Sequence, residues 1–404
     1  MGKQKSILLC VAGSMFWCAC SNNQNKDNTY WETAPVVAQR IQMEHGELID
    51  FKPELLQDTI VFPLSYFCEE PVFVKLEDSD EALISSSQRV LMSDNYFLIM
   101  PSGTTPCKLF DKKGKFVATI GRLGGGPGEY NRATSSFIDE ENQKIYIASY
   151  NSSDLLIYNF SGKSIGKVTL PWKVFECYFQ VEKDRVKVVN QPNRNPAPIV
   201  WSQNLEGTQI DSIMTPQLAL PRGLWTMGIT VGETEDTSVY FMTYPKGRSD
   251  SLYHVDFEKQ LFIPRFTMDM SKLEKYAHVY KEWPRHFVGS TSEEITTVSY
   301  TENGEDMRVT GDPAKFYIVD KKTLKGAYLR IEDDYKTGIE LGRPIDLLSN
   351  KALVRNLDPG NLAEALEKVL GTNNLPEKTR NQLTTLYEGI GDDSNNYIMY
   401  ARMK

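Results

Sequence analysis

The chain has 404 residues, of which 41% are hydrophobic and 24% are charged, and its formal net charge at pH 7 is -8. This acidic balance disfavours nucleic acid and anionic lipid as ligands, so the sequence predicts no nucleic-acid partner. Three of the six cysteines lie within the first 20 residues, and the three that follow cannot all pair within one chain. A small disulfide-held scaffold is thereby excluded, and the length is sufficient for a large hydrophobic core.

Residues 1–19 have the pattern of a secretory signal peptide. Lys3 and Lys5 precede an apolar run from Ile7 to Trp17. The run is about half of the roughly 20 residues that a membrane-spanning helix needs. Removal of the signal takes away its two lysines and changes the formal charge from -8 to -10.

Cys20 is the predicted site of lipid attachment. Ala19 and Cys20 resemble the end of a lipobox, in which the cysteine receives diacylglycerol and becomes the new N-terminus; Trp17 and Cys18 depart from its usual residues. Ordinary signal cleavage is the alternative. The polar stretch that follows is typical of a flexible tether, and we expect residues 20–58 to form a tether and an N-terminal segment. The expected location is the cell envelope, with the membrane as partner through the lipid anchor.

A two-strand pattern occurs five times between residues 109 and 331. Each copy is an apolar run, a polar turn with Gly, Asn, Asp or Lys, and a second apolar run, which is typical of a β-hairpin. A further apolar strand precedes most copies, as in Tyr96–Met100. The copies are Leu109–Ile120, Leu156–Val168, Val200–Ile213, Leu252–Phe266 and Phe316–Ile331.

Repetition of such units about every 45 to 65 residues indicates a β-propeller with four strands per blade. Five copies and one blade shared between the termini predict an all-β fold, a six-bladed β-propeller over residues 59–404. Pro71–Leu76 or Tyr397–Met403 would complete the shared blade, and closure leaves no long exposed edge strand. A β-sandwich is the alternative, but it predicts strands without a fixed period.

A glycine-rich motif follows the first hairpin directly. It lacks the Gly-Lys-Ser/Thr ending of a phosphate-binding loop, and no apolar helix follows it. We interpret it as a tight connection between blades, in which glycines supply positive φ angles. Its residues are Gly121, Arg122, Gly124, Gly126, Pro127, Gly128, Glu129 and Tyr130.

Together with the Phe110-Asp111-x-x-Gly114-Lys115 hairpin, this motif resembles the six-bladed NHL-like or TolB-like propeller lipoproteins of Bacteroides and relatives. The resemblance extends over about residues 60–404 and includes the segment Asp392–Asn396 before the last strand. It implies the fold and a location in the cell envelope, but no activity. Three tripeptides also resemble the O-glycosylation acceptor pattern of these bacteria, with Thr59, Ser212 and Ser251 as candidate acceptors.

Candidate catalytic and metal-binding residues are few. His278, Glu282 and His286 lie close together in the sequence, but the spacing of the two histidines matches no standard zinc pattern. No Gly-x-Ser-x-Gly nucleophile elbow occurs, and the three later cysteines lie in strand-like segments. The sequence therefore predicts no catalytic residue, no metal ligand and no cofactor.

Two short amphipathic helices are predicted near the C-terminus. Asp358 and Pro359 form a helix start, leucines recur at helical spacing, and Gly371 ends the run. Pro376 starts the second helix, which ends before Gly391. We expect these helices to form a short C-terminal helical hairpin inserted in the last blade, at about residues 358–391.

The function that these features favour is binding or scaffolding, with a protein or a glycan as partner. Aromatic side chains stack on sugar rings, although strands also favour them; the candidates are Trp172, Trp201, Trp225 and Trp283. The alternative is a propeller-type lyase or hydrolase that acts on a glycan or lactone, with a metal at the central channel.

Overall fold

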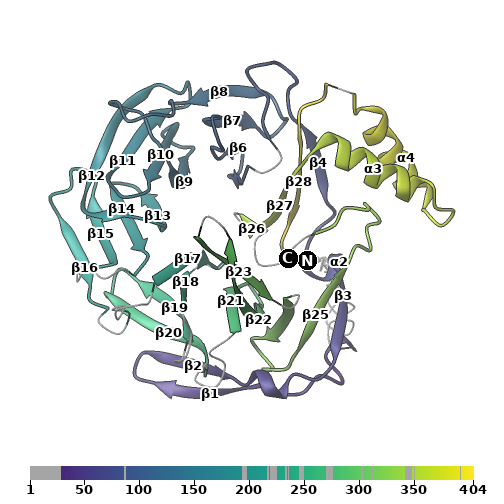
Figure 1. Cartoon of the computed structure of the whole chain (residues 1–404), viewed down its shortest axis with the longest axis horizontal. Helices are drawn as coiled ribbons and strands as arrows, with labels where there is room; N and C mark the ends of the chain where they lie inside the picture. The colour runs from purple at the N-terminus through teal and green to yellow at the C-terminus, as the bar shows by residue number, and fades with distance from the viewer. Residues whose placement is uncertain are drawn as a thin grey trace, which may run out of the picture.

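The computed structural model describes residues 29–404 except 86–87, 193–197, 216–217, 219–224, 233, 235, 245–249, 270–275, 302–303, 312–313, 342–347, 350 and 392. Within the described residues, six sheets surround a central axis as the blades of a propeller (Figure 1). The prediction of an all-β six-bladed propeller is confirmed. The signal peptide, Cys20 and most of the tether lie outside the described part.

The first three blades each contain four antiparallel strands that follow one another in the chain. Blade 1 contains β5 (Val90–Met92), β6 (Tyr96–Ile99), β7 (Cys107–Asp111) and β8 (Phe116–Ile120). Blade 2 contains β9 (Ala133–Asp139), β10 (Lys144–Ser149), β11 (Ser152–Asn159) and β12 (Ser164–Val174). Blade 3 contains β13 (Cys177–Glu182), β14 (Arg185–Asn190), β15 (Val200–Asn204) and β16 (Ile210–Ile213).

The other three blades combine later strands with strands from the N-terminal part of the chain. Blade 4 contains β17 (Trp225–Val231), β18 (Thr237–Tyr244), β19 (Asp250–Asp256) and β20 (Leu261–Met268). Blade 5 contains β21 (Tyr276–Glu282), β22 (His286–Thr301), β24 (Lys315–Asp320) and β25 (Gly326–Glu332), and β23 (Gly304–Gly311) pairs with the end of β22. Blade 6 contains β26 (Leu348–Ser349), β27 (Ala352–Leu357) and β28 (Tyr397–Arg402). The five hairpins found in the sequence are the third and fourth strands of blades 1 to 5.

The N-terminal strands run along the outside of three consecutive blades, and we call them the N-terminal belt: β1 (Ala38–Met43), β2 (Gly46–Phe51), β3 (Thr59–Pro63) and β4 (Val72–Lys75). β2 pairs in parallel with β20, and β3 pairs in parallel with β25. β4 pairs antiparallel with β28 and completes blade 6, so both segments predicted for the shared blade contribute to it. Residues 38–51, which the sequence pattern assigns to the segment ahead of the propeller, are therefore strands of blade 4.

The belt is fixed by aromatic side chains. Phe62 in β3 is fully buried, and its ring lies 4.9 Å from that of Tyr66 and 5.4 Å from that of Phe67. The indole Nε1 of Trp31 donates a hydrogen bond of 3.0 Å to Tyr66 Oη, and Trp31 packs against Phe62. Each such buried aromatic side chain stabilises the fold by about 1.5–3 kcal/mol, so this cluster holds the N-terminus to the ring.

The predicted helical insertion is confirmed: α3 (Pro359–Leu370) and α4 (Glu377–Glu388) lie between β27 and β28. Asp358 caps α3 by accepting a hydrogen bond from the Asn361 amide, which satisfies one of the unpaired N–H groups of the first turn. The apolar face of the pair is buried against blade 6, through Leu362, Leu366 and Leu383. Among the described residues, no helix is long and apolar enough to cross a membrane.

The two ends of the ring carry connections of different length. Turns of two to five residues join the first strand to the second in all six blades and the third strand to the fourth in blades 1 to 5. Because the strands are antiparallel, these turns share one end, which we call the short-turn end. The opposite end carries most of the long connections, including residues 76–89, 121–132 and the helical insertion.

Candidate functional site

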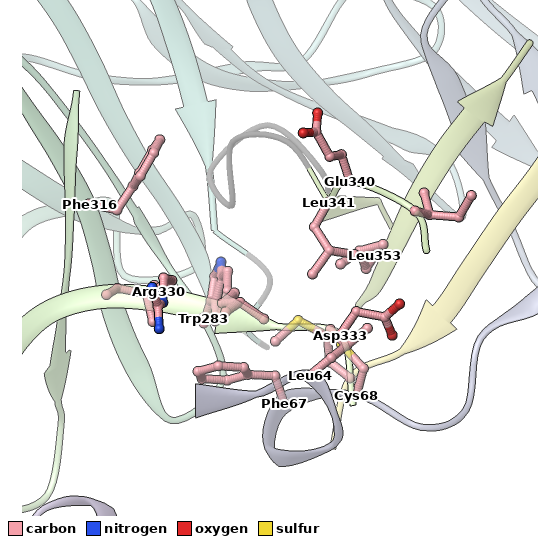
Figure 2. A pocket seen from close by; sticks show the side chains of 14 residues that line it. Leu64, Phe67, Cys68, Trp283, Phe316, Arg330, Asp333, Glu340, Leu341 and Leu353 are labelled. Atoms are coloured by element: carbon pink, nitrogen blue, oxygen red, sulfur yellow. The ribbon is translucent and has the colours of Figure 1, made fainter. Parts of the chain in front are cut away.

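A cavity of about 390 Å³ lies between blades 5 and 6 (Figure 2). Eleven of its fourteen lining side chains are apolar or, in the case of Cys68, weakly polar, and three are charged. The lining consists of Leu64, Phe67, Cys68, Trp283, Phe316, Leu329, Arg330, Ile331, Asp333, Ile339, Glu340, Leu341, Leu353 and Met403. This volume and this mainly apolar lining are typical of pockets that bind small molecules.

The N-terminal belt supplies one wall of the cavity. After β3, the short helix α2 (Leu64–Phe67) crosses from blade 5 to blade 6. Cys68 then bridges to Met403 at the end of β28, and the Lys404 amide donates a hydrogen bond to Phe67 O at 2.9 Å. The ring of Phe67 stands edge-on to that of Trp283 at 5.2 Å. The cavity therefore depends on the same segment that closes the ring.

Two polar atoms in the cavity wall lack hydrogen-bond partners among the described residues. Trp283 is 3% exposed, and its indole Nε1 is buried without an acceptor. Asp333 uses its Oδ2 to accept hydrogen bonds of 2.9 Å from Thr337 Oγ1 and the Gly338 amide, whereas its buried Oδ1 has no donor. Both atoms are covered by other protein atoms, so they are buried groups behind the cavity surface and not contact points on it.

A buried ionic network joins blade 4 to blade 5 near the cavity. His254 Nε2 and Lys321 Nζ each lie 2.6 Å from a carboxylate oxygen of Glu282. His254 Nδ1 lies 3.3 Å from the exposed carboxylate of Asp236. Burial alone would raise the pKa of Glu282, but the hydrogen bond from His254 and the charge of Lys321 outweigh it and lower the pKa to about 2.

The histidines and the carboxylate that were considered as metal ligands do not converge. Glu282 is engaged by His254 and Lys321, and His278 Nε2 lies 2.8 Å from Tyr317 Oη. The His286 ring stacks on Trp31, and burial and the charge of Arg285 lower its pKa to about 3, so the ring is neutral. Within the described ranges, no group of three or more His, Cys, Asp or Glu side chains is arranged to hold a metal ion.

The three cysteines beyond the signal region are buried thiols. Desolvation raises the pKa of Cys68, Cys107 and Cys177 to about 12 in each case. A thiol with so high a pKa carries almost no thiolate at neutral pH, so none of the three is an activated nucleophile. Cys68 contributes only its apolar surface to the cavity.

The glycine motif connects β8 of blade 1 to β9 of blade 2. Gly121 and Gly128 have φ angles of +63° and +72°, which glycine adopts without strain. Tyr130 is 1% exposed, and its hydroxyl accepts from the Cys107 amide and donates to Ile120 O. The Glu129 carboxylate accepts from the Gly126 amide at 2.9 Å. Arg122 and Pro127 are exposed.

The remaining candidate residues lie apart from the cavity. Thr59 is exposed in β3, Ser212 is half-buried in β16, and the Ser251 hydroxyl in β19 donates to Thr267 Oγ1 at 2.9 Å. Trp201 is fully buried and presents no face for a sugar, whereas Trp172 is half-buried and makes a T-shaped contact with Trp201; the side chain of Trp225 lies outside the described part. The cavity itself was missed from sequence, because its walls come from six separate segments.

Comparison with known proteins identifies relatives without an assigned activity. A family model described as a domain of unknown function, DUF4934, matches residues 47–402. A crystal structure of a candidate exported protein from Bacteroides fragilis is 17% identical, with a TM-score of 0.54, over 86% of this chain and 99% of that chain. A member of the DUF4221 family from Bacteroides vulgatus is 11% identical, with a TM-score of 0.43, over 83% and 97%. A search of curated proteins finds no match.

The ionic network gives a prediction for Glu282→Gln. The substitution removes one partner of a buried charge cluster, so the free energy of unfolding at pH 7 should fall by about 3 kcal/mol. The folded-state pKa is depressed, so the contribution is present above the unfolded-state value near 4.5 and is lost as the pH falls toward 2. Urea denaturation at pH 7 and pH 3 measures both effects.

The matched control is Glu258→Gln, which changes an exposed carboxylate in the turn between β19 and β20. It should alter the free energy of unfolding by less than about 0.5 kcal/mol. If Glu282→Gln is no more destabilising than this control, or if its effect does not shrink at low pH, the network is not a source of stability.

Proposed function

The chain belongs to the DUF4934 family of domains of unknown function, and we propose that it is a lipid-anchored binding protein of the cell envelope that takes its ligand in the cavity between blades 5 and 6. The observation that carries this proposal is the volume and the mainly apolar lining of this cavity, which are typical of pockets that bind small molecules.

Binding without catalysis is favoured over a propeller-type lyase or hydrolase. Such an enzyme would gather metal ligands or acids from several blades around the channel. Among the described side chains, Glu282 is instead held by His254 and Lys321, and the cysteine thiols are not activated. No observation in the described ranges favours the enzyme over the binding protein.

The position of the proposed anchor fits a protein that presents one end of the ring to a partner. Trp31 docks at the short-turn end, where Lys325 Nζ donates to its carbonyl at 2.7 Å and His286 stacks on its ring. The eleven residue-to-residue steps from Cys20 to Trp31 can span at most about 40 Å, so a lipid on Cys20 would hold this end near the membrane. The end with the long connections would then face away, toward a protein or glycan partner. The similar fold of an exported protein from Bacteroides fragilis supports this location.

The anchor is tested by Cys20→Ala in the native host. The variant has no thiol to receive diacylglycerol, so it should move from the membrane fraction to the soluble fraction and lose labelling by radioactive palmitate. Cys18→Ala, two residues away, is the control and should remain labelled. Labelled, membrane-bound Cys20→Ala would exclude attachment at Cys20.

The cavity is tested with the neutral apolar dye Nile red and the variant Leu353→Trp, which adds a large ring to the cavity wall. The wild-type chain should bind one dye molecule, and the variant should bind it at least about tenfold more weakly. Overpacking costs about 1–3 kcal/mol and can prevent the first variant from folding. Leu341→Trp therefore serves as a second variant, which fills the cavity from another segment. Val117→Trp on the exposed face of β8 is the control. Unchanged dye binding in both filled variants would refute the proposed site.

A further inference from the structure

We propose that the basic turns of blades 5 and 6 at the short-turn end form a surface that binds anionic phospholipid headgroups. We call this surface the basic face; it consists of Arg285, Lys321, Lys322, Lys325 and Lys351. The inference rests on the lipid anchor proposed above and adds a second contact with the same membrane. It follows from the distribution of charge, from the exposure of these side chains and from the place where the chain reaches the ring.

Charge is unevenly distributed among the turns of the short-turn end. Among the described residues, these turns carry five basic residues and no acid in blades 5 and 6. The corresponding turns of blades 1 to 4 carry six lysines and seven acids, as in blade 2, where Glu140 and Glu141 stand against Lys163. The charges of those four blades nearly cancel, so the positive charge of this end is concentrated on two neighbouring blades (Figure 1).

Most of the basic face reaches the protein surface. Arg285 lies in the turn between β21 and β22, Lys322 in the turn between β24 and β25, and Lys351 just before β27. All three are exposed. Lys321 is the exception, because its ammonium lies 2.6 Å from a buried carboxylate oxygen of Glu282. Three of the five side chains thus extend positive charge to the surface.

The acidic residues that contact these turns do not cancel this charge. Besides Glu282, they are Asp320 and Glu32 in the described chain. Asp320 accepts hydrogen bonds from backbone amides of its own turn. Glu32 is exposed, and its backbone oxygen lies 3.4 Å from the ammonium of Lys325. Five basic side chains less these three carboxylates leave two positive charges on the basic face.

The basic face lies where the chain arrives from the proposed anchor. Lys325 and the ring of His286 dock Trp31, so the N-terminal segment joins the ring beside the turns of blade 5. Eleven residue-to-residue steps separate Cys20 from Trp31, and a coil of this length has a root-mean-square end-to-end distance of about 18 Å. A lipid on Cys20 would therefore keep the basic face at high local concentration beside the headgroups, where a weak contact is effective.

The acidic charge of the whole chain does not prevent this contact. Without the two lysines of the signal, the formal charge changes from -8 to -10. Salt screens exposed charges beyond about 8 Å at physiological ionic strength, however, so a membrane at this end responds to the basic face and not to acids on distant blades. Each basic residue close to an anionic surface strengthens binding roughly fivefold.

The test is sedimentation of the exported chain with large vesicles. The Cys20→Ala chain is used, so that no attached lipid contributes. One set of vesicles contains equal parts of phosphatidylcholine and phosphatidylglycerol, and the other contains phosphatidylcholine alone. The chain should bind the anionic vesicles at least about tenfold more strongly than the neutral ones at about 0.1 M NaCl. This binding should disappear at about 1 M NaCl, where the screening length is about 3 Å.

Charge reversal tests the location. Lys322→Glu combined with Lys351→Glu should weaken binding to the anionic vesicles at least about tenfold. The control combines Lys113→Glu with Lys163→Glu, which are exposed in turns of blades 1 and 2 and make the same change in net charge; it should weaken binding less than about threefold. Retained folding is checked by circular dichroism. If the reversed pair does not fold, Lys322→Gln with Lys351→Gln takes its place and should weaken binding at least about fivefold.

The outcomes separate this inference from the proposed function. Equal binding to anionic and neutral vesicles, or equal effects of the two pairs of substitutions, would overturn the basic face as a lipid contact. Absence of binding to the anionic vesicles would also overturn it and would leave these cations for an acidic protein partner. None of these results depends on labelling at Cys20 or on dye binding in the cavity, which test the proposed function by themselves.

Discussion

Strand pairing between the N-terminal belt and the outer strands of blades 4, 5 and 6 is the constraint on which the rest of the structure depends. β2 and β3 add parallel strands to β20 and β25, and β4 supplies the fourth strand of blade 6. Without the belt, blade 6 would have three strands and the outer edges of blades 4 and 5 would be open to pairing with other chains. Closure therefore rests on residues separated from their partners by more than 200 positions.

The candidate site is a consequence of this closure. α2 carries the chain from blade 5 to blade 6, and the space that it bridges is the cavity. The same region holds Trp31, whose contacts with Tyr66 and His286 fix the N-terminus at the short-turn end. A lipid anchor, a closed ring and a ligand cavity would thus share one structural element, so binding of the proposed ligand would stabilise the docked belt.

The sequence reveals local features of this fold better than distant ones. The five outer hairpins and both helices are recognised from the sequence. Their signals are the spacing of apolar residues, the turn residues and helix caps such as Asp358, and these lie within a few positions of one another. β1 and β2 are not recognised as part of the ring, because a parallel partner more than 200 residues away leaves no local signal. The cavity is also invisible in sequence, since Trp283, Asp333 and Leu353 become neighbours only after closure. Likewise, Glu282 pairs with His254 and Lys321 rather than with the nearby histidines.

Hydrogen exchange of the backbone amides, followed by mass spectrometry of the full exported chain, tests the central claim most directly. If the belt closes the ring, amides of β2 and β3 should be protected as strongly as those of their partners β20 and β25, because all of them open in one cooperative unit. Rapid exchange in β2 and β3 while β20 and β25 remain protected would show that the belt is a loose appendage, and that neither the closed ring nor the cavity depends on it.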